Sequence, residues 1–489
     1  MIRKISLFFV LLLIVTGCTA TEYVKPEENA VFYEIFVDSF YDSDGDGHGD
    51  LLGVKEKLDY IQKDLGATGI WLMPVHPSDS YHKYDVIDYK DIDQRYGTMD
   101  DMEQLIEEMN HRDMDLIIDL VINHTSHNNP WFIEGVKEFN DGNCNTYCNY
   151  YNFSKENKAN YNKHGSGVYY ESGFSHTMPD LNLDDVNVRE EIKDITKFWV
   201  DKGVSGFRLD ATTHFYDNNL GKNTEFLTWF SDYAYSLNDD LIIVGEAWTD
   251  ASIIKQMYRS NISFFNFSIA QNNGRLTKSI NRSAGADFAQ YVVNYNDDIR
   301  QYNPNAKDSV FLSNHDHGRS ASYFMNDEQK LKLAASTYLL MPGDVYVYYG
   351  EEIGMIGSGR DENKRLAMQW GVDKGMTKSP KDHDYTGELT MNLKDQQKDS
   401  QSIFNHYKSV ISVRNMYPQI STALPTAVDL NDSALYAIQY DDIIIVHNFS
   451  SEALTIEGSY EIVNDVLGGK SSENGILLNG YQSVVLNKK

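Results

Sequence analysis

The sequence predicts an α/β protein built on a (β/α)8 barrel, with a small domain inserted after the third strand and an antiparallel β-domain at the C-terminus. Short apolar segments recur along the chain, and amphipathic helical segments lie between most of them. This alternation is typical of a parallel sheet that is buried on both faces. Eight such units in a chain of 489 residues favour a closed barrel over a doubly wound sheet.

The predicted strands are short runs of mostly apolar residues, and the first of them reads VFYEIFVDSF. They cover residues 31–40, 69–75, 115–124, 204–210, 240–248, 262–269, 309–316 and 344–349. Helices are predicted where apolar residues recur at helical spacing, at 54–65, 102–110, 188–202 and 227–237. In the second of these helices the apolar residues share one face, and Gly203 ends the third.

Two regions interrupt the barrel pattern. Residues 125–178 are polar and rich in Asn and Tyr, which predicts a small irregular domain inserted after the third strand. From about residue 420 the chain shows short alternating runs separated by turn residues, which predicts antiparallel β-structure. The predicted organisation is therefore a barrel over 31–124 and 179–419, an inserted domain over 125–178 and a C-terminal domain over 420–489.

The composition is strongly acidic, with 72 Asp and Glu residues, 43 Lys and Arg residues and a formal net charge of -29. Such an excess argues against nucleic acid or an anionic membrane surface as a partner. The chain also contains 33 tyrosines. Tyrosine presents a flat apolar face and a polar tip, which suits contacts with sugars, although many tyrosines are expected in the core.

The N-terminus predicts export. Arg3 and Lys4 precede an apolar run over residues 5–15, and small residues follow it. This run is shorter than a membrane-spanning helix requires. Residues 1–17 are therefore predicted to be a secretory signal peptide.

The signal peptide is followed by features of a lipid anchor. Residues 15–18, VTGC, resemble a bacterial lipobox, which implies cleavage before Cys18 and lipid attachment to its sulfur. The alternative is an ordinary signal peptide with a chance cysteine at this position. Residues 18–30 are polar and predict a tether, so the chain is expected at the bacterial cell surface, in contact with the membrane only through the anchor.

Two further cysteines, Cys144 and Cys148, lie in the predicted inserted domain. In an exported protein such a pair can form a disulfide. Their short spacing and the lack of nearby Cys or His partners argue against a zinc site.

An acidic loop follows the first predicted strand. Residues 42–50 read DSDGDGHGD, with carboxylates at alternate positions and glycines between them. This pattern lets oxygen ligands surround a hard cation, as in an EF-hand loop, although a strand precedes it and the twelfth position is Gly. The alternative is a solvated acidic turn. The predicted calcium ligands are Asp42, Asp44, Asp46, the carbonyl of His48 and Asp50.

Polar residues gather at the ends of four predicted strands. Active sites of such barrels lie at the C-terminal ends of the strands. These residues are Asp119, Asn123 and His124, then Arg208 and Asp210, then Glu246, and finally Asn314, His315 and Asp316. In an extended strand, Arg208 and Asp210 project from one face, and alone they are equally consistent with a structural ion pair. Several carboxylates around one rim instead indicate glycosidic cleavage.

These residues lie in stretches that resemble the sequence motifs of the α-amylase family, glycoside hydrolase family 13. The matching stretches are 119–124 (DLVINH), 206–210 (GFRLD) with His214, 244–248 (VGEAW), 311–316 (FLSNHD) and 178–182 (MPDLN). The MPDLN form resembles a group intermediate between oligo-1,6-glucosidases and neopullulanases. The resemblance implies a (β/α)8 barrel with an inserted domain B and a C-terminal β-sandwich, domain C.

The resemblance also implies a retaining mechanism with three catalytic residues. Asp210 would attack the anomeric carbon, Glu246 would act as the acid and then the base, and Asp316 would stabilise the transition state. The attacking and acid carboxyls are then expected about 5–5.5 Å apart. The positive charge of Arg208 would favour the ionised form of Asp210.

Further substrate and metal contacts follow from the same resemblance. His124 and His315 would hydrogen-bond the sugar that is cut, and Tyr84 would stack on its ring. A second calcium would be held by Asn123, Asp180 and the carbonyl of His214, where domain B meets the barrel. Many α-amylases carry Lys before the last His of the second motif, whereas this chain has Thr213, which leaves any product-side contact of that Lys in doubt.

The expected function is an exported α-amylase that cuts α-1,4 bonds within starch and maltooligosaccharides. Its partner is then an α-glucan polysaccharide or oligosaccharide, and a monomer is expected. A neopullulanase-like hydrolase or glucanotransferase with α-1,6 or transfer activity is the first alternative. A non-catalytic glucan-binding lipoprotein is a remote alternative, because such a protein is expected to have lost one of Asp210, Glu246 and Asp316, and all three are present.

Overall fold

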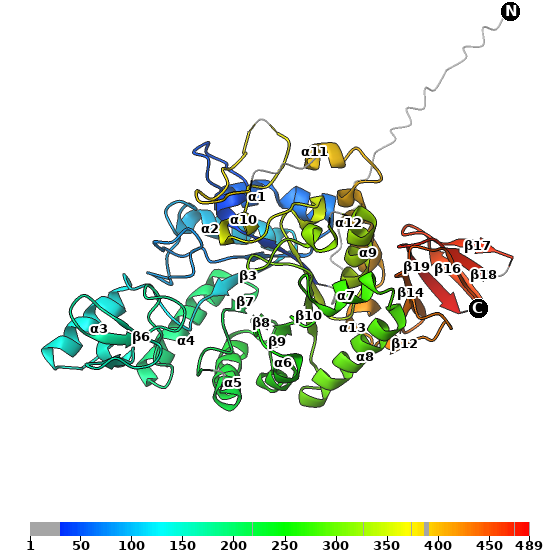
Figure 1. The fold of residues 1–489 in the computed structure, drawn as a ribbon. Helices are drawn as coiled ribbons and strands as arrows, with labels where there is room; N and C mark the ends of the chain where they lie inside the picture. The colour runs from blue at the N-terminus through cyan, green and yellow to red at the C-terminus, as the bar shows by residue number, and fades with distance from the viewer. Residues whose placement is uncertain are drawn as a thin grey trace, which may run out of the picture.

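The computed structural model describes residues 30–217, 219–325, 327–372, 374–385, 391–473 and 475–488 (Figure 1). The predicted signal peptide, the lipidation of Cys18 and the tether up to residue 29 lie outside the described residues. Within the described part of the chain, no helix is both long enough and apolar enough to cross a membrane.

The centre of the molecule is a closed barrel of parallel strands, in the spatial order β1-β11-β10-β9-β8-β7-β3-β2. Most of these strands are buried along their whole length, as expected for parallel strands that are covered on both faces. This architecture confirms the predicted fold class. The strands are β1 Val31–Ile35, β2 Gly69–Leu72, β3 Asp115–Leu120, β7 Gly206–Leu209, β8 Ile242–Gly245, β9 Ser263–Phe265, β10 Asp308–Phe311 and β11 Asp344–Tyr348.

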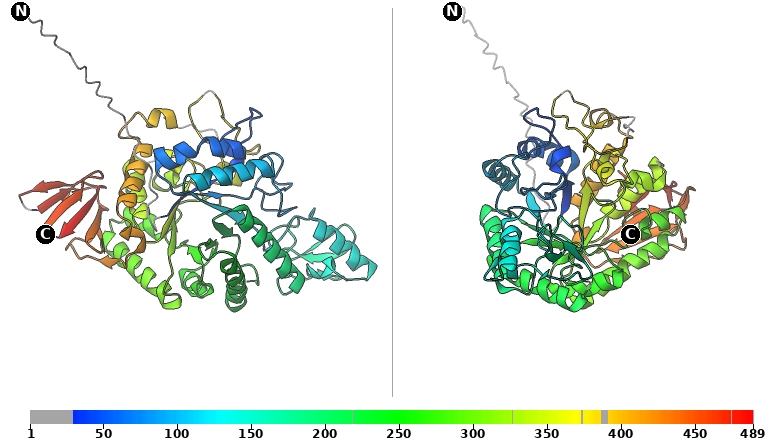
Figure 2. Two further views of the ribbon diagram at one scale, coloured as in Figure 1. Left: turned by 180° about the vertical axis from the view of Figure 1, so that it is seen from behind. Right: turned by 60° about the vertical axis from the view of Figure 1, so that its left-hand side comes forward.

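Helices surround the barrel (Figures 1 and 2). The main ones are α1 Leu51–Glu56, α2 Met99–His111, α4 Val186–Lys202, α5 Leu220–Leu237, α6 Ala251–Met257, α7 Arg275–Asn281, α8 Gly285–Tyr302, α9 Glu328–Leu339 and α12 Ile403–Met416. Short helices are α10 Asp361–Lys364, α11 Leu393–Gln396 and α13 Gln419–Thr422, with the 3-10 turns η1 Val37–Ser39, η4 Tyr258–Ser260, η5 Ser320–Phe324 and η6 Glu351–Ile353.

The helix expected at 54–65 differs from the prediction. The carboxylate of Asp50 accepts a hydrogen bond from the Gly53 N–H, so the helix is capped there and α1 begins at Leu51. A π-helical segment, η2 Tyr60–Leu65, follows after a short break, and Gly66 with a φ of 95° ends it. The amphipathic pattern therefore located a helical region but not the change in its winding.

The segment between β3 and α4 extends away from the barrel (Figure 1). It contains a helix, α3 Pro130–Asp141, that the polar composition did not reveal; Asn129 caps it and Pro130 occupies its first turn. The remaining elements are η3 Tyr147–Asn149 and a small sheet of β4 Phe153–Ser154, β6 Tyr169–Glu171 and β5 Tyr161–Lys163. Cys144 and Cys148 form a disulfide in this segment.

The C-terminal strands form two antiparallel sheets on the opposite side of the barrel from α3 (Figures 1 and 2). One sheet contains β12 Thr426–Ala427, β13 Leu435–Tyr440, β14 Ile443–Asn448, β19 Ser483–Lys488 and β16 Tyr460–Asn464. The other contains β15 Leu454–Ile456, β18 Gly475–Leu478 and β17 Lys470–Ser472. Alternating apolar side chains from both sheets, among them Val446 and Leu478, build a core of their own.

The barrel register decides which side chains meet at the site. Asp119 of β3 pairs with Arg208 of β7, and Arg208 pairs with Val244 of β8. Because the strands are parallel, all of them end on the same face of the barrel. The residues that follow β3, β7, β8 and β10 therefore converge on one rim.

Candidate active site

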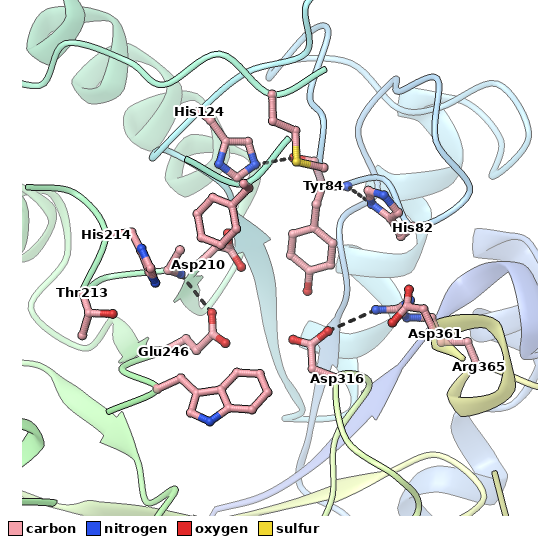
Figure 3. A pocket seen from close by; sticks show the side chains of 14 residues that line it. His82, Tyr84, His124, Asp210, Thr213, His214, Glu246, Asp316, Asp361 and Arg365 are labelled. Atoms are coloured by element: carbon pink, nitrogen blue, oxygen red, sulfur yellow. Dashed lines mark hydrogen bonds and ion pairs between the residues drawn. The ribbon is translucent and has the colours of Figure 1, made fainter. Parts of the chain in front are cut away.

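A cavity of about 310 Å³ lies at this rim. Figure 3 shows Asp210, Glu246 and Asp316 facing it, with the Tyr84 ring next to Asp316 and the His124 ring at the top of the view. The structure thus brings together the three predicted catalytic residues. The lining residues are His82, Tyr84, His124, Phe174, Met178, Asp210, Ala211, Thr213, His214, Glu246, Trp248, Asp316, Asp361 and Arg365.

Arg208 lies beneath the cavity and contacts three carboxylates. Its Nη1 is 2.8 Å from Asp119 Oδ1 and 2.7 Å from Asp210 Oδ1, and its Nη2 is 2.9 Å from Glu246 Oε2. The guanidinium has no exposed surface. A buried cation that is bound in this way holds the surrounding acids in place, because leaving it unpaired would cost several kcal/mol, about 3–5.

Glu246 is positioned by the residue after Asp210. Ala211 adopts a φ of 51°, which is unusual for a residue with a side chain, and its N–H donates to Glu246 Oε2 at 3.0 Å. Burial raises the pKa of Glu246 to about 7, the charge of Arg208 opposes this, and the nearby Asp210 and Asp316 raise it further. Glu246 can therefore hold a proton near neutral pH, as a general acid must.

Asp316 has the opposite electrostatic environment. Its Oδ1 is 3.2 Å from Arg365 Nη2, and its Oδ2 is 3.1 Å from His315 Nε2. Burial alone would raise the pKa of Asp316, but the charges of His315, Arg365 and Arg208 outweigh burial and hold it well below its usual range. Asp316 therefore stays ionised where Glu246 stays protonated, which separates the roles of the two acids.

Two predicted sugar ligands, Tyr84 and His124, line the cavity. The His124 Nε2 lies 3.1 Å from the Tyr84 carbonyl, and burial lowers the pKa of His124, so its ring is neutral near pH 7. The Tyr84 hydroxyl donates to Asp119 Oδ2 at 2.9 Å. His315 and Arg208 are fully buried behind this wall, and His315 is absent from the cavity lining, so its direct contact with sugar stays a prediction.

The predicted ligands of the second calcium line a polar cavity of about 300 Å³ beside domain B. The Asn123 amide lies 3.4 Å from Asp180 Oδ1, and His214 borders the same cavity. Burial raises the pKa of Asp180 to about 7, with a further contribution from Glu171. Glu171 is a candidate ligand that the sequence reasoning did not name. Oxygen donors gathered in this way suit calcium.

The acidic loop after β1 brings some of its carboxylates together. Asp42, Asp44 and Asp50 each place an oxygen within 4.8 Å of the others. The Asp46 carboxylate instead accepts the His48 N–H at 2.7 Å, and the His48 ring pairs with Asp38. An all-oxygen cluster fits a hard cation such as calcium.

Several residues at the cavity had no signal in the strand pattern. Asp361 and Arg365 come from α10 and the residue after it, and they are ion-paired with each other across one helical turn. Trp248 and Phe174 line the cavity with about half of their surface exposed, 52% and 49%. An exposed aromatic residue beside a cavity that contains carboxylates is suited to stack on a sugar, which could have been inferred for Trp248 from its place two residues after Glu246.

Comparisons with known proteins agree with this geometry. A family model described as "Alpha amylase, catalytic domain" matches residues 34–423. "Alpha-amylase 3" of Dictyoglomus thermophilum is 37% identical over 99% of this chain and 98% of its own length. The "Oligo-1,6-glucosidase" of Parageobacillus thermoglucosidasius is 30% identical over 87% of this chain and 90% of its own. The solved structure "Eubacterium rectale Amy13B" superposes with a TM-score of 0.91 at 40% identity and covers 95% of this chain and 96% of that chain.

Removal of the buried cation is expected to destabilise the protein in a pH-dependent way. Arg208 lowers the pKa of both Asp119 and Glu246. In R208M these carboxyls should hold their protons to higher pH when folded than when unfolded, so stability falls as pH rises. We expect a loss of about 3–5 kcal/mol at pH 8 and a clearly smaller loss at pH 5.

Thermal and urea unfolding of wild type, R208M and R208K at the two pH values would measure this effect. R208K is the matched control, because it keeps a positive charge and loses only the forked geometry. An equal loss of stability at both pH values in R208M would contradict the electrostatic role of Arg208.

Proposed function

Because the chain belongs to the α-amylase family of glycoside hydrolases, we propose that it cuts α-1,4-glucosidic bonds within starch and maltooligosaccharides, with retention at the anomeric carbon. The observation that carries this proposal is the pairing of Asp210 and Glu246 on one guanidinium, with the pKa of Glu246 raised by burial to about 7. A retaining glycosidase needs one ionised carboxylate and one protonated carboxyl at the same bond.

The catalytic steps follow from the positions of these acids. Asp210 attacks the anomeric carbon as Glu246 gives its proton to the leaving oxygen, and a covalent glycosyl-enzyme forms. Glu246, now ionised, removes a proton from water, and the water releases the sugar. Asp316, held ionised by His315 and Arg365, supplies negative charge beside the oxocarbenium-like transition state.

The cavity walls support a sugar chain rather than a small apolar ligand. Tyr84, Phe174 and Trp248 provide aromatic faces, and His124 and Asp316 provide groups for hydroxyls. The cavity is open, with Trp248 and Phe174 half exposed at its edge, so a chain can extend beyond the residue that is cut. This openness supports internal cutting of a polymer.

A second candidate function has two observations in its favour. Residues 178–182, MPDLN, resemble the form found in the group between oligo-1,6-glucosidases and neopullulanases, and a relative is named an oligo-1,6-glucosidase. Met178 of this stretch lines the cavity. An enzyme that also cuts α-1,6 bonds, or transfers glucosyl groups, is therefore the alternative.

We predict that soluble starch is cut internally and that E246Q lowers kcat by at least about a hundredfold, because the general acid is lost. In wild type, kcat/KM should fall as pH rises through about 7, since Glu246 loses its proton there. Release of reducing ends measures the rate of hydrolysis, and loss of iodine colour measures internal cutting of starch. Glu107 is exposed on α2, so E107Q is the matched control and should resemble wild type.

The same purified proteins distinguish internal α-1,4 cutting from α-1,6 cutting, glucosyl transfer and glucan binding. Products from pullulan report α-1,6 or neopullulanase-like cutting, and longer products from maltotriose report transfer. Early accumulation of only glucose or maltose from starch, with iodine colour retained, would overturn internal cutting. Binding of starch with no turnover by wild type would overturn hydrolysis and revive a glucan-binding role.

We also propose that calcium binds at the loop of residues 42–50, through Asp42, Asp44 and Asp50, and at the domain B cavity, through Asn123, Asp180 and the His214 carbonyl. When bound, calcium would bridge acids that otherwise repel one another. Asp50 also caps α1, and Asp180 pairs across an isolated bridge with His124. The first site would therefore support the start of α1, and the second would support His124 at the cavity.

Removal of calcium is expected to lower the unfolding temperature. EGTA treatment followed by calcium titration should give a concentration-dependent recovery, with about 2.7 kcal/mol regained at a hundred times the Kd. D44N should weaken the effect at the first site, and D180N at the second. Elemental analysis that finds no calcium, together with an unchanged melting temperature, would refute both sites.

We further propose that the chain is exported and held at the cell surface by a lipid on Cys18. Three features support this proposal: the basic N-terminus, the apolar run and the VTGC sequence. A surface location also suits a polymer substrate, because a polymer cannot enter the cell and must be cut outside it. In a bacterial host, wild type should incorporate labelled fatty acid and pellet with membranes. C18A should do neither, and equal labelling of the two would refute the anchor.

A further inference from the structure

Glu34 is a buried acid that the proposed mechanism does not use. It lies on β1 with 1% of its surface exposed. Its Oε1 is 2.5 Å from His315 Nδ1, and the His315 backbone N–H donates to the same oxygen at 3.4 Å. A buried carboxylate costs several kcal/mol unless it is paired, so the contact with His315 accounts for its presence in an otherwise apolar strand.

The other ring nitrogen of His315 faces the cavity wall. Nε2 lies 2.7 Å from the Tyr84 hydroxyl and 3.1 Å from Asp316 Oδ2. Both of these partners line the cavity, whereas Glu34 and His315 do not. The imidazole therefore connects a carboxylate inside the barrel to two groups that face the substrate.

The hydrogen-bond partners of the His315 ring indicate which of its nitrogens carry protons. Asp119 is bound to Arg208 Nη1 through both oxygens, at 2.8 and 3.1 Å, so it acts as an acceptor and takes the single Tyr84 proton. His315 Nε2 must then donate to the Tyr84 oxygen. Nδ1 faces the Glu34 carboxyl, whose pKa is raised by burial and lowered by the charge of His315. With Glu34 ionised, its oxygen accepts from Nδ1–H, so both nitrogens carry protons and the ring is a cation.

The charges around the ring agree with this assignment. Burial would lower the pKa of His315, but Asp316 and Glu34 outweigh burial and raise it to about 9. Arg208 and Arg365 act on the acids beside the ring and not through a contact with it. The titratable or charged groups that surround the ring are Glu34, Tyr84, Asp119, Arg208, Asp316, His317 and, beside Glu34 on β11, Tyr348.

We propose that Glu34 is a positioning residue whose carboxylate keeps His315 oriented and doubly protonated, so that the Nε2–H holds Asp316 and Tyr84 in place at the cavity wall. Glu34 itself does not touch the substrate. The proton stays on the ring throughout the reaction, so no transfer step is added to the mechanism. The kinetic readout below rests on the proposed hydrolysis, whereas the spectroscopic readout does not.

Nitrogen NMR of histidine-labelled protein tests the protonation directly. The His315 signals, identified by their absence in H315Q, should report two protonated nitrogens in wild type up to about pH 8. In E34Q, the amide oxygen still accepts from Nδ1–H but the negative charge is gone, so the ring should lose a proton near or below pH 7. A neutral His315 ring in wild type at pH 7 would overturn the proposal without any variant.

Kinetics test whether the charge matters to catalysis. The wild-type to E34Q ratio of kcat/KM cancels the titration of Glu246, which both proteins share. This ratio should be near one at about pH 5.5 and grow about tenfold per pH unit once the variant ring loses its proton. E34D restores the charge and should bring the ratio back toward one.

A matched control separates this effect from simple loss of a buried acid. Glu352 is also fully buried and accepts from Tyr33, which precedes Glu34 on β1, at 2.7 Å. E352Q should lower the melting temperature but leave the pH dependence of kcat/KM unchanged. A constant E34Q ratio across pH, or a pH-dependent ratio in E352Q as well, would show that Glu34 has only a structural role. Failure of the proposed hydrolysis would instead appear as an inactive wild type with an intact His315 signal.

Discussion

Burial of the Arg208 guanidinium is the constraint on which the site depends. A charge with no exposed surface must be matched by acids, and the barrel supplies them from β3, from the end of β7 and from the end of β8. Each acid is fixed in turn by its contact with the cation. The parallel register that pairs Asp119 with Arg208 is therefore as important for the chemistry as for the fold. A shift by one residue would turn Arg208 away from all three acids.

The backbone at Ala211 helps the ion pairs to orient Glu246. Ala211 occupies a left-handed conformation directly after Asp210, and its N–H binds the same oxygen of Glu246 that faces Arg208. Both contacts use Oε2, which leaves Oε1 of Glu246 as the oxygen that can present a proton to the cavity. Strain at one residue thus orients the acid, and packing of the surrounding barrel maintains that strain.

The sequence predicted those parts of the molecule that repeat and those that end a strand. Apolar runs identified the barrel, and acids at the ends of these runs, such as Asp210 and Glu246, identified the rim. Arg365 could not be found in this way, because it follows the short helix α10 and lies well beyond the end of β11. Glu34 is the one acid within β1 and is visible in the sequence, but its partner, His315, is known only from the structure. Side-chain pairing over hundreds of residues is a property of the fold and not of a local pattern.

The balance of charge around the cavity explains why the acids behave differently. Acidic groups outnumber cationic ones here: Glu34, Asp119, Asp210, Glu246, Asp316 and Asp361 face Arg208, His315, Lys364 and Arg365. Asp316 lies between two of the cations and stays ionised, whereas Glu246 shares one cation with two other acids and has its pKa raised. Burial keeps a proton on Glu246, and the neighbouring acids Asp210 and Asp316 add to this effect. The same excess of acids favours a positively charged transition state, so it assists both the acid that gives a proton and the sugar that becomes a cation.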